Sequence, residues 1–395
     1  MRLLHIRPDH VGGGALKRTV RAGGCGRERI HERQYLPVRG VSEHCRCHSK
    51  CAEKCQAAET SMKTFALTRA NDSAQAIATA AKATTAQQGA EIRFIGGGTT
   101  LIDLMKLNVE QPKTLIDINR LPLDKIEALP DGGLTIGAVV RNSDLAYHPL
   151  VRKNYAVLSE AILSGATVQL RNMATTAGNL LQRTRCMYFR ATDMPCNKRE
   201  PGSGCAAITG ANRSLAILGA SEHCIATNPS DMNVAMAALE ATIHVQGPKG
   251  ERSIPIADFH VLPGNTPQRE TVLEPGDLIT HVTLPPPAPG SRSLYLKLRD
   301  RASYEFALAS AAVVITVAGG KITRARIALG GVGTKPWRST EAEGELTGQP
   351  ATQAVFQKAA DAALRGAKPQ SENGFKVDLA KRCLVHALKL ATQTA

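Results

Sequence analysis

One short stretch, a strand that runs into three consecutive glycines and then into a helix, most constrains how this chain can fold. The sequence predicts a strand over Glu91–Ile95, a glycine-rich turn over Gly96–Thr100 and a helix in which apolar residues recur from Leu101 to Leu107. Glycines let backbone N–H groups approach phosphate oxygens closely, and the helix start adds a favourable dipole. The pattern indicates a pyrophosphate cradle. It matches neither Gly-x-Gly-x-x-Gly nor a Walker loop, so alone it is also typical of turns that bind nothing.

A second polar stretch strengthens the prediction of a ligand site. Ala174–Leu181 again combines two hydroxyl residues with a glycine and an asparagine amide. Asn142–Leu145 and the pair Ser230 and Asp231 add polar groups where secondary-structure elements are predicted to begin or end.

The rest of the chain predicts an α+β protein with a break near residue 288. Strand and helix patterns alternate after Met62, with a strand at Lys63–Leu67 and a helix at Asp72–Ala86. Further on, the sequence predicts a hairpin of Ile126–Leu129 with Leu134–Val139 around Asp131–Gly133, paired strands at Ala241–Val245 and Arg252–Pro255, and a strand at Asp277–Leu284. The clearest linker is Pro285–Gly290. Beyond it the sequence predicts a small antiparallel sheet backed by helices, with strands at Ser293–Leu298, Ala311–Val317 and Ile322–Leu329 and helices at Ala351–Leu364 and Lys376–Ala391.

Residues 1–61 show no sustained strand or helix period. We expect a disordered tail or a non-native N-terminal extension there. The alternative is a metal site built from a cysteine run flanked by histidines, at His44, Cys45, Cys47, His48, Cys51 and Cys55.

Charge and hydropathy exclude two classes of protein. The net charge is +15, but aromatics make up only 4% and no basic stripe with interleaved aromatics occurs, so we expect no nucleic-acid partner. A basic solvated surface or a docking face for an acidic partner explains the charge. No apolar run reaches the roughly 18–20 residues that cross a bilayer, so we expect no membrane span. Without an export signal, a cytoplasmic location is the default expectation, and export to the periplasm with a partner subunit is the alternative.

Four of the ten cysteines fall in one segment of unusual composition, at Cys186, Cys196, Cys205 and Cys224. Four thiolates can hold a [4Fe–4S] cluster or a tetrahedral zinc ion, and the spacing is unlike that of ferredoxins, so chemistry alone leaves both open beside scattered buried thiols. Four nearby cations either offset the negative charge of a thiolate-ligated group or form a solvated loop face: Arg183, Arg185, Lys198 and Arg199. Cys383 lies in a helical pattern and is predicted to be a core residue.

Residues 62–395 resemble the FAD-binding subunits of the xanthine dehydrogenase family of molybdenum hydroxylases, nearest to the flavin subunit of PaoABC-type aldehyde oxidoreductases. The resemblance rests on Phe94–Lys106, Thr175–Leu181 and Arg299–Tyr304. It implies a FAD-binding PCMH-type domain of two α/β subdomains over residues 62–288, with a [4Fe–4S] insertion at about 182–224. A CO-dehydrogenase-flavoprotein-like C-terminal domain would follow over residues 291–395.

The resemblance also implies the site residues. The cofactor FAD would contact Arg93, Phe94, Ile95, Gly96, Gly97, Gly98, Thr99, Thr100, Leu101, Thr175, Gly178, Asn179, Asp231, Leu278, Ile279 and Lys297. The four cysteines, Cys186, Cys196, Cys205 and Cys224, would hold the [4Fe–4S] cluster. No catalytic residue is expected, because redox reactivity belongs to the cofactor.

The function that the resemblance implies is that of an electron-transfer oxidoreductase subunit in a heterotrimer or a multiple of one. A molybdopterin-binding large subunit would oxidise an aldehyde to a carboxylic acid, and a 2Fe–2S small subunit would pass electrons to FAD and then to an external acceptor. The alternatives are the flavin subunit of a 4-hydroxybenzoyl-CoA reductase-like enzyme and a zinc-stabilised, non-redox nucleotide-binding protein.

Overall fold

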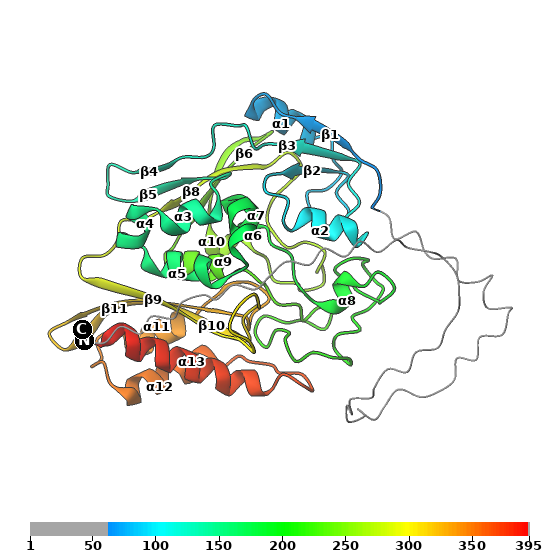
Figure 1. The fold of residues 1–395 in the computed structure, drawn as a ribbon. Helices are drawn as coiled ribbons and strands as arrows, with labels where there is room; N and C mark the ends of the chain where they lie inside the picture. The colour runs from blue at the N-terminus through cyan, green and yellow to red at the C-terminus, as the bar shows by residue number, and fades with distance from the viewer. Residues whose placement is uncertain (1–61, 394–395) are drawn as a thin grey trace, which may run out of the picture. The chain divides into compact units, whose positions relative to one another are not determined.

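The computed structural model describes residues 62–393, which all lie in one compact unit, Ala57–Ala395 (Figure 1). The expected N-terminal extension and its cysteine–histidine run lie outside the described residues. Three sheets follow one another along the chain, and the fold is α+β, as predicted. No helix in the described part of the chain is both long and apolar enough to span a bilayer.

The first sheet places the glycine turn. It is parallel, with the order β1 (Ala66–Arg69), β3 (Thr114–Asp117) and β2 (Ile92–Ile95). Helix α1 (Ser73–Ala80) covers it and begins at Asp72, whose Oδ1 accepts the Gln75 N–H at 2.7 Å. Parallel strands end at a common edge, so the turn between β2 and α2 (Leu101–Lys106) lies beside the end of β3. There the Asn119 amide donates to the Gly96 carbonyl at 3.0 Å.

The second sheet is antiparallel and has the order β4-β5-β8-β6-β7. Its strands are β4 (Ile126–Ala128), β5 (Leu134–Gly137), β8 (Leu278–Leu284), β6 (Thr242–Gly247) and β7 (Gly250–Pro255). The predicted hairpin between β4 and β5 and the predicted pairing of β6 with β7 are confirmed. Helices of the middle of the chain pack beside this sheet, namely α3 (Asn142–Tyr147), α4 (Pro149–Asn154), α5 (Ala156–Ser164), α6 (Val168–Met173), α7 (Thr176–Leu180), α9 (Asp231–Ala238) and α10 (Ile256–Phe259).

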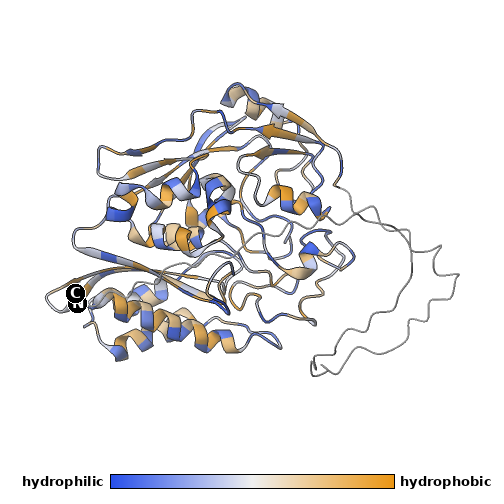
Figure 2. Cartoon of the chain, viewed as in Figure 1, coloured by the Kyte–Doolittle hydropathy of each residue, from blue (hydrophilic) through white to orange (hydrophobic). Residues whose placement is uncertain are grey.

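The third sheet is antiparallel and closes the C-terminal part of the chain. Its order is β12-β11-β10-β9, from β9 (Ser291–Leu298), β10 (Ala309–Ala318), β11 (Lys321–Gly330) and β12 (Trp337–Arg338). Three helices lie along it: α11 (Thr340–Leu346), α12 (Gln353–Ala363) and α13 (Phe375–Thr392). Hydrophobic and hydrophilic residues alternate around α12 and α13 (Figure 2), and the apolar stripe of α13, including Cys383, enters the core.

The cysteine-bearing segment, residues 182–229, contains a single short helix, α8 (Met187–Arg190). Its far end is fastened to the C-terminal part of the chain. The buried Lys376 ammonium donates to the carbonyls of Ser214 and Leu215 at 3.0 and 2.9 Å, and Asn212 accepts the Glu372 N–H at 3.0 Å. The segment is therefore held by hydrogen bonds to distant residues rather than by a sheet of its own.

Two boundaries near the start of the described residues differ from the sequence prediction by three residues or more, for local reasons. The first strand begins at Ala66 rather than Lys63, because pairing with β3 starts there. Helix α1 ends at Ala80 rather than Ala86, because Lys82 and Ala83 turn back to bond carbonyls only three residues before them. Two threonines, Thr84 and Thr85, follow at once and have low helix propensity.

Candidate flavin and cysteine sites

The glycine turn lies directly against the second polar stretch. A Cβ atom on Gly97 would lie 1.9 Å from the Met173 carbonyl oxygen, and one on Gly96 would lie 3.0 Å from Thr175 Oγ1. Gly98 has φ +71°, a conformation that favours glycine. The triple glycine is thus required for close backbone packing as well as for the turn itself. The two stretches that the sequence singled out separately form one surface.

Asn179 and Thr175 are fixed by local hydrogen bonds. Thr175 caps α7, with its Oγ1 accepting the Gly178 N–H at 3.2 Å. The buried Asn179 Oδ1 accepts the Ser230 hydroxyl at 2.7 Å, which ties α7 to the start of α9. Ser230 is the N-cap of α9, so the residue that follows it, Asp231, is brought to the same surface.

A cavity of about 600 Å³ opens between these groups. That volume is within the roughly 300–1,000 Å³ of typical small-molecule sites. Its wall includes the hydroxyl residues of the glycine turn, the small residues at the end of α5, and parts of α6, α7, α9 and β9. Six of the predicted FAD residues line it: Thr99, Thr100, Gly178, Asn179, Asp231 and Lys297.

A buried ion pair forms the C-terminal side of this cavity. Lys297 Nζ lies 2.8 Å from Asp231 Oδ2 and 3.1 Å from the Ser164 carbonyl. The Tyr295 hydroxyl donates to Asp231 Oδ1 at 2.6 Å and lies 2.9 Å from Ser310 Oγ. Burial, and then the Asp231 carboxylate, raise the pKa of Tyr295 well above its ordinary value, so its hydroxyl stays protonated. The Tyr295 hydroxyl therefore fixes the Asp231 carboxylate, and this carboxylate fixes the Lys297 ammonium.

Replacing Tyr295 by phenylalanine should weaken the fold and loosen this side of the cavity. The Asp231 Oδ1 atom would lose its hydrogen bond in a buried position, which costs about 1–3 kcal/mol. Urea unfolding of the Tyr295→Phe variant measures that loss of unfolding free energy. Tyr147→Phe removes an exposed hydroxyl and should leave the midpoint unchanged. Equal midpoints for the two variants would contradict the role assigned to Tyr295.

Three buried polar atoms of cavity-lining residues have no hydrogen-bond partner among the described residues. They are Asn142 Oδ1, Arg171 Nε and Arg190 Nη1. Buried polar groups are nearly always bonded in native proteins, so these atoms fit a polar ligand in the cavity. Arg171 is otherwise anchored by its Nη1, which donates to the Gly165 carbonyl at 2.7 Å.

Other predicted FAD residues do not line this cavity. Leu278 and Ile279 are buried in hydrophobic clusters. The other members of the turn and of the α7 start are neighbours of lining residues in the chain but do not line the cavity themselves: Ile95, Gly96, Gly97, Gly98, Leu101 and Thr175. Arg93 and Phe94 line a second, smaller cavity of about 160 Å³, which shares Gln182 with the larger one.

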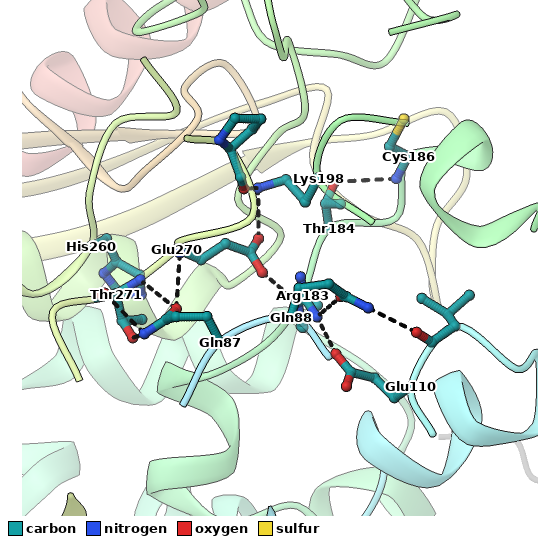
Figure 3. A network of polar contacts seen from close by, with 12 residues as sticks. Gln87, Gln88, Glu110, Arg183, Thr184, Cys186, Lys198, His260, Glu270 and Thr271 are labelled. Carbon is teal, nitrogen blue, oxygen red and sulfur yellow. Dashed lines mark hydrogen bonds and ion pairs between the residues drawn. The ribbon is translucent and has the colours of Figure 1, made fainter. Parts of the chain in front are cut away.

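A chain of paired charges, some half-buried and some buried, extends beside the smaller cavity (Figure 3). Glu110 pairs with Arg93 at 3.1 Å and with Arg183, and Arg183 also pairs with Glu270. On the other side of Glu270, Lys198 Nζ lies 3.0 Å from Oε1. Burial alone would raise the pKa of the Glu270 carboxyl, but Arg183 and Lys198 lower it to about 2.

The four predicted cysteine ligands come together in the structure. Cys186, Cys196 and Cys224 are buried, Cys205 is half-buried, and all four line one small cavity of about 10 Å³. A β-bridge joins Cys196 to Cys205, and all four side chains are free thiols. Burial raises the pKa of Cys186 to about 11. Among residues 62–393, no three or more Cys, His, Asp or Glu side chains are arranged to hold a single metal ion.

Sequence reasoning missed several residues of these sites, namely Tyr295, Ser310, Arg171, Glu110 and Glu270. A signal for Tyr295 was available. It stands two residues before Lys297 on a strand, where alternation places both side chains on one face. Neither glutamate carries a comparable local signal, because each pairs with an arginine more than seventy residues away.

Comparison with known proteins gives the family. Residues 52–287 match the model described as "FAD binding domain in molybdopterin dehydrogenase", and residues 294–391 match "CO dehydrogenase flavoprotein C-terminal domain". The chain therefore belongs to the family of FAD-binding subunits of molybdenum hydroxylases, and it is an oxidoreductase subunit. This membership stands against the alternative of a non-redox nucleotide-binding protein.

Particular relatives agree with this assignment. The chain is 53% identical to the aldehyde oxidoreductase FAD-binding subunit PaoB of Escherichia coli, over 85% of this chain and 100% of that one. It is 27% identical to the carbon monoxide dehydrogenase medium chain of Hydrogenophaga pseudoflava, over 77% of this chain and 91% of that one. A solved structure of carbon monoxide dehydrogenase from the same organism superposes with a TM-score of 0.65 at 26% identity, covering 83% of this chain and 97% of that one.

Proposed function

We propose that this chain is the FAD-carrying, electron-transferring subunit of a molybdenum-dependent aldehyde oxidoreductase. The observation that carries the proposal is 53% identity along the whole of an aldehyde oxidoreductase FAD-binding subunit. A molybdopterin-binding large subunit would oxidise an aldehyde to a carboxylic acid. A 2Fe–2S small subunit would pass the electrons to FAD in this chain, and an external acceptor would take them from there.

The predicted domain boundaries belong to the same proposal. The FAD-binding domain would span residues 62–288 and the C-terminal domain residues 291–395. The two family matches, at residues 52–287 and 294–391, support this division. So does the irregular connection between β8 and β9, which contains Pro285–Gly290.

The cavity residues fit FAD. Its diphosphate would lie where the Gly96–Thr100 turn meets Thr175–Asn179, because backbone N–H groups and hydroxyls gather there. When bound, the cofactor supplies the redox chemistry. Lys297 offers a fixed positive charge, held by Asp231, to the flavin half. The remaining predicted contacts, Arg93, Phe94, Ile95, Leu101, Leu278 and Ile279, stay part of this proposal.

We also propose that Cys186, Cys196, Cys205 and Cys224 hold a [4Fe–4S] cluster. The support is their convergence from four loops onto one buried cavity as free thiols. A single zinc ion is the alternative. Four cysteine sulfurs around one zinc ion would lie about 3.8 Å from one another, because Zn–S bonds are about 2.3 Å long and the geometry is tetrahedral. Iron and zinc analysis of the purified complex decides between the two, because a cluster adds about four iron atoms to those of the 2Fe–2S subunit, whereas a zinc site adds zinc and no iron.

Cofactor analysis of a Lys297→Met variant tests the flavin site. The complex co-expressed with its partner subunits should contain FAD, whereas the variant should bind FAD about tenfold more weakly or worse, a loss of 1.4 kcal/mol. The physical reason is that methionine cannot supply the positive charge and leaves Asp231 unpaired. Lys321→Met, at an exposed lysine in β11, should keep full occupancy. A flavin-free parent complex would refute the proposed function.

A further inference from the structure

Lys198 occupies the centre of the cysteine segment. It comes two residues after Cys196, and it lines the same small cavity as the four cysteines. Asn197 fixes the loop on both sides. Its Oδ1 accepts the Gly204 N–H at 2.8 Å, next to Cys205, and its Nδ2 donates to the His223 carbonyl at 3.1 Å, next to Cys224.

The Lys198 ammonium is buried and tightly held. Only 8% of its side chain is exposed. Its Nζ donates to the Pro267 carbonyl at 2.9 Å and to Glu270 Oε1 at 3.0 Å. Glu270 is shared with Arg183, and Arg183 is shared with Glu110, so Lys198 ends a continuous chain of ion pairs that range from half-buried to buried (Figure 3).

The charges of this chain do not cancel. Three cations, Arg93, Arg183 and Lys198, are paired with two carboxylates, Glu110 and Glu270, so one positive charge is left over. An uncompensated buried charge is costly unless an opposite charge lies nearby. Four thiolates around a [4Fe–4S] core or a zinc ion form a group with net negative charge. The cavity of the four cysteines places such a group next to Lys198.

Arg199, the adjacent cation, is engaged differently. Its guanidinium donates to the carbonyls of Tyr188 and Phe189 at 2.7 and 2.9 Å, is half-buried, and does not line the cysteine cavity. Arg185 is paired with Asp103 at 3.1 Å. Of the six Lys and Arg residues in residues 182–229, Lys198 is the one that lines that cavity.

We propose that Lys198 is a positioning residue whose fixed positive charge stabilises the anionic group held by the cysteine quartet and raises the reduction potential of a cluster bound there. The inference rests on the proposed thiolate-ligated group. A reduced cluster carries one more negative charge than an oxidised one, so a nearby cation favours the reduced form. Glu270 and Arg183 serve to hold the ammonium in place.

The test compares Lys198→Met, Lys198→Arg and Lys249→Met in the complete complex. Each is analysed for iron and FAD and titrated potentiometrically by electron paramagnetic resonance. Lys198→Met should lower the equilibrium constant for one-electron reduction of the cluster about tenfold, which corresponds to a reduction potential about 59 mV lower. Lys198→Arg keeps the charge and should restore most of the potential. Lys249 is exposed in the turn between β6 and β7, and its variant should match the parent.

Each outcome of this test either supports or overturns the inference. Full iron with an unchanged reduction potential in Lys198→Met overturns the inference. An equal loss of iron or of potential in Lys198→Met and Lys198→Arg also overturns it, because the shape of the lysine side chain rather than its charge would then matter. Iron loss in Lys198→Met that Lys198→Arg restores supports it. A parent that contains zinc and only the iron of its 2Fe–2S subunit refutes the cluster alone. In that case, the parent and Lys198→Met are compared for how well they retain zinc in the presence of a chelator. Weaker retention in Lys198→Met supports the inference, and equal retention overturns it.

Discussion

Replacing Gly97 by alanine is expected to empty the FAD site. The added Cβ would lie 1.9 Å from the Met173 carbonyl oxygen and 3.0 Å from Ala174 Cα. Both are backbone atoms, so the turn itself must move away from the segment that precedes α7. That movement separates Gly96–Thr100 from Thr175–Asn179, whose joint surface would hold the diphosphate. FAD affinity should fall at least about tenfold, or 1.4 kcal/mol. The measurement is FAD per chain after purification and after titration with added FAD.

A matched control separates this effect from a general response to the Gly→Ala change. Gly344, in α11, is exposed, and a Cβ there meets no other atom within 4 Å. Gly344→Ala should therefore keep its FAD and gain about 0.5–1 kcal/mol of unfolding free energy, as expected for alanine in a helix. Unaltered FAD binding in Gly97→Ala would show that the packing of this turn does not matter to the cofactor.

Local patterns predicted most of the elements but not their arrangement. Alternating residues located β6, β8 and β9, and a turn signal located the β4–β5 hairpin. The insertion of β8 between β5 and β6 was not predictable, because β8 lies more than thirty residues beyond β6 and more than one hundred beyond β5. Helix α11 was missed as well. Its seven residues include a glycine, and its start depends on Ser339 capping the Ala342 N–H.

For the candidate sites, too, local patterns predicted the residues but not how they come together in space. The glycine turn and the Thr175–Asn179 stretch could be predicted as polar sites, because their residue types signal the chemistry. Their contact depends on the Met173 backbone, which carries no such signal. The sequence also left open whether the cations near the cysteines form a solvated face. For Lys198, that alternative is wrong, because the side chain is buried against Glu270, seventy-two residues away.

Replacing Cys196 by serine should remove the iron while leaving the loop in place. The backbone at Cys196 is held independently of its sulfur. Its N–H donates to Ser203 Oγ at 3.0 Å, and its carbonyl accepts the N–H groups of Arg199 and Glu200 at 3.0 and 2.7 Å. Serine can keep these bonds, but its hydroxyl is not the thiolate that a cluster requires. We expect the iron content of the complex to fall by about four atoms per copy of this chain, which leaves only the iron of the 2Fe–2S subunit, with FAD retained. Metal and flavin analysis of the complex measures both.

The buried thiol of Cys383 provides the control for this experiment. It lies on the buried face of α13, with its Sγ 3.8 Å from the Leu296 carbonyl, and is remote in sequence from the quartet. Cys383→Ser should cost some stability, because it places a hydroxyl in an apolar core, but it should keep all of its iron. Iron lost equally from both variants would point to general unfolding, and iron kept in Cys196→Ser would remove that cysteine from the ligand set. Only loss confined to Cys196→Ser assigns the metal to the cavity that the four cysteines share.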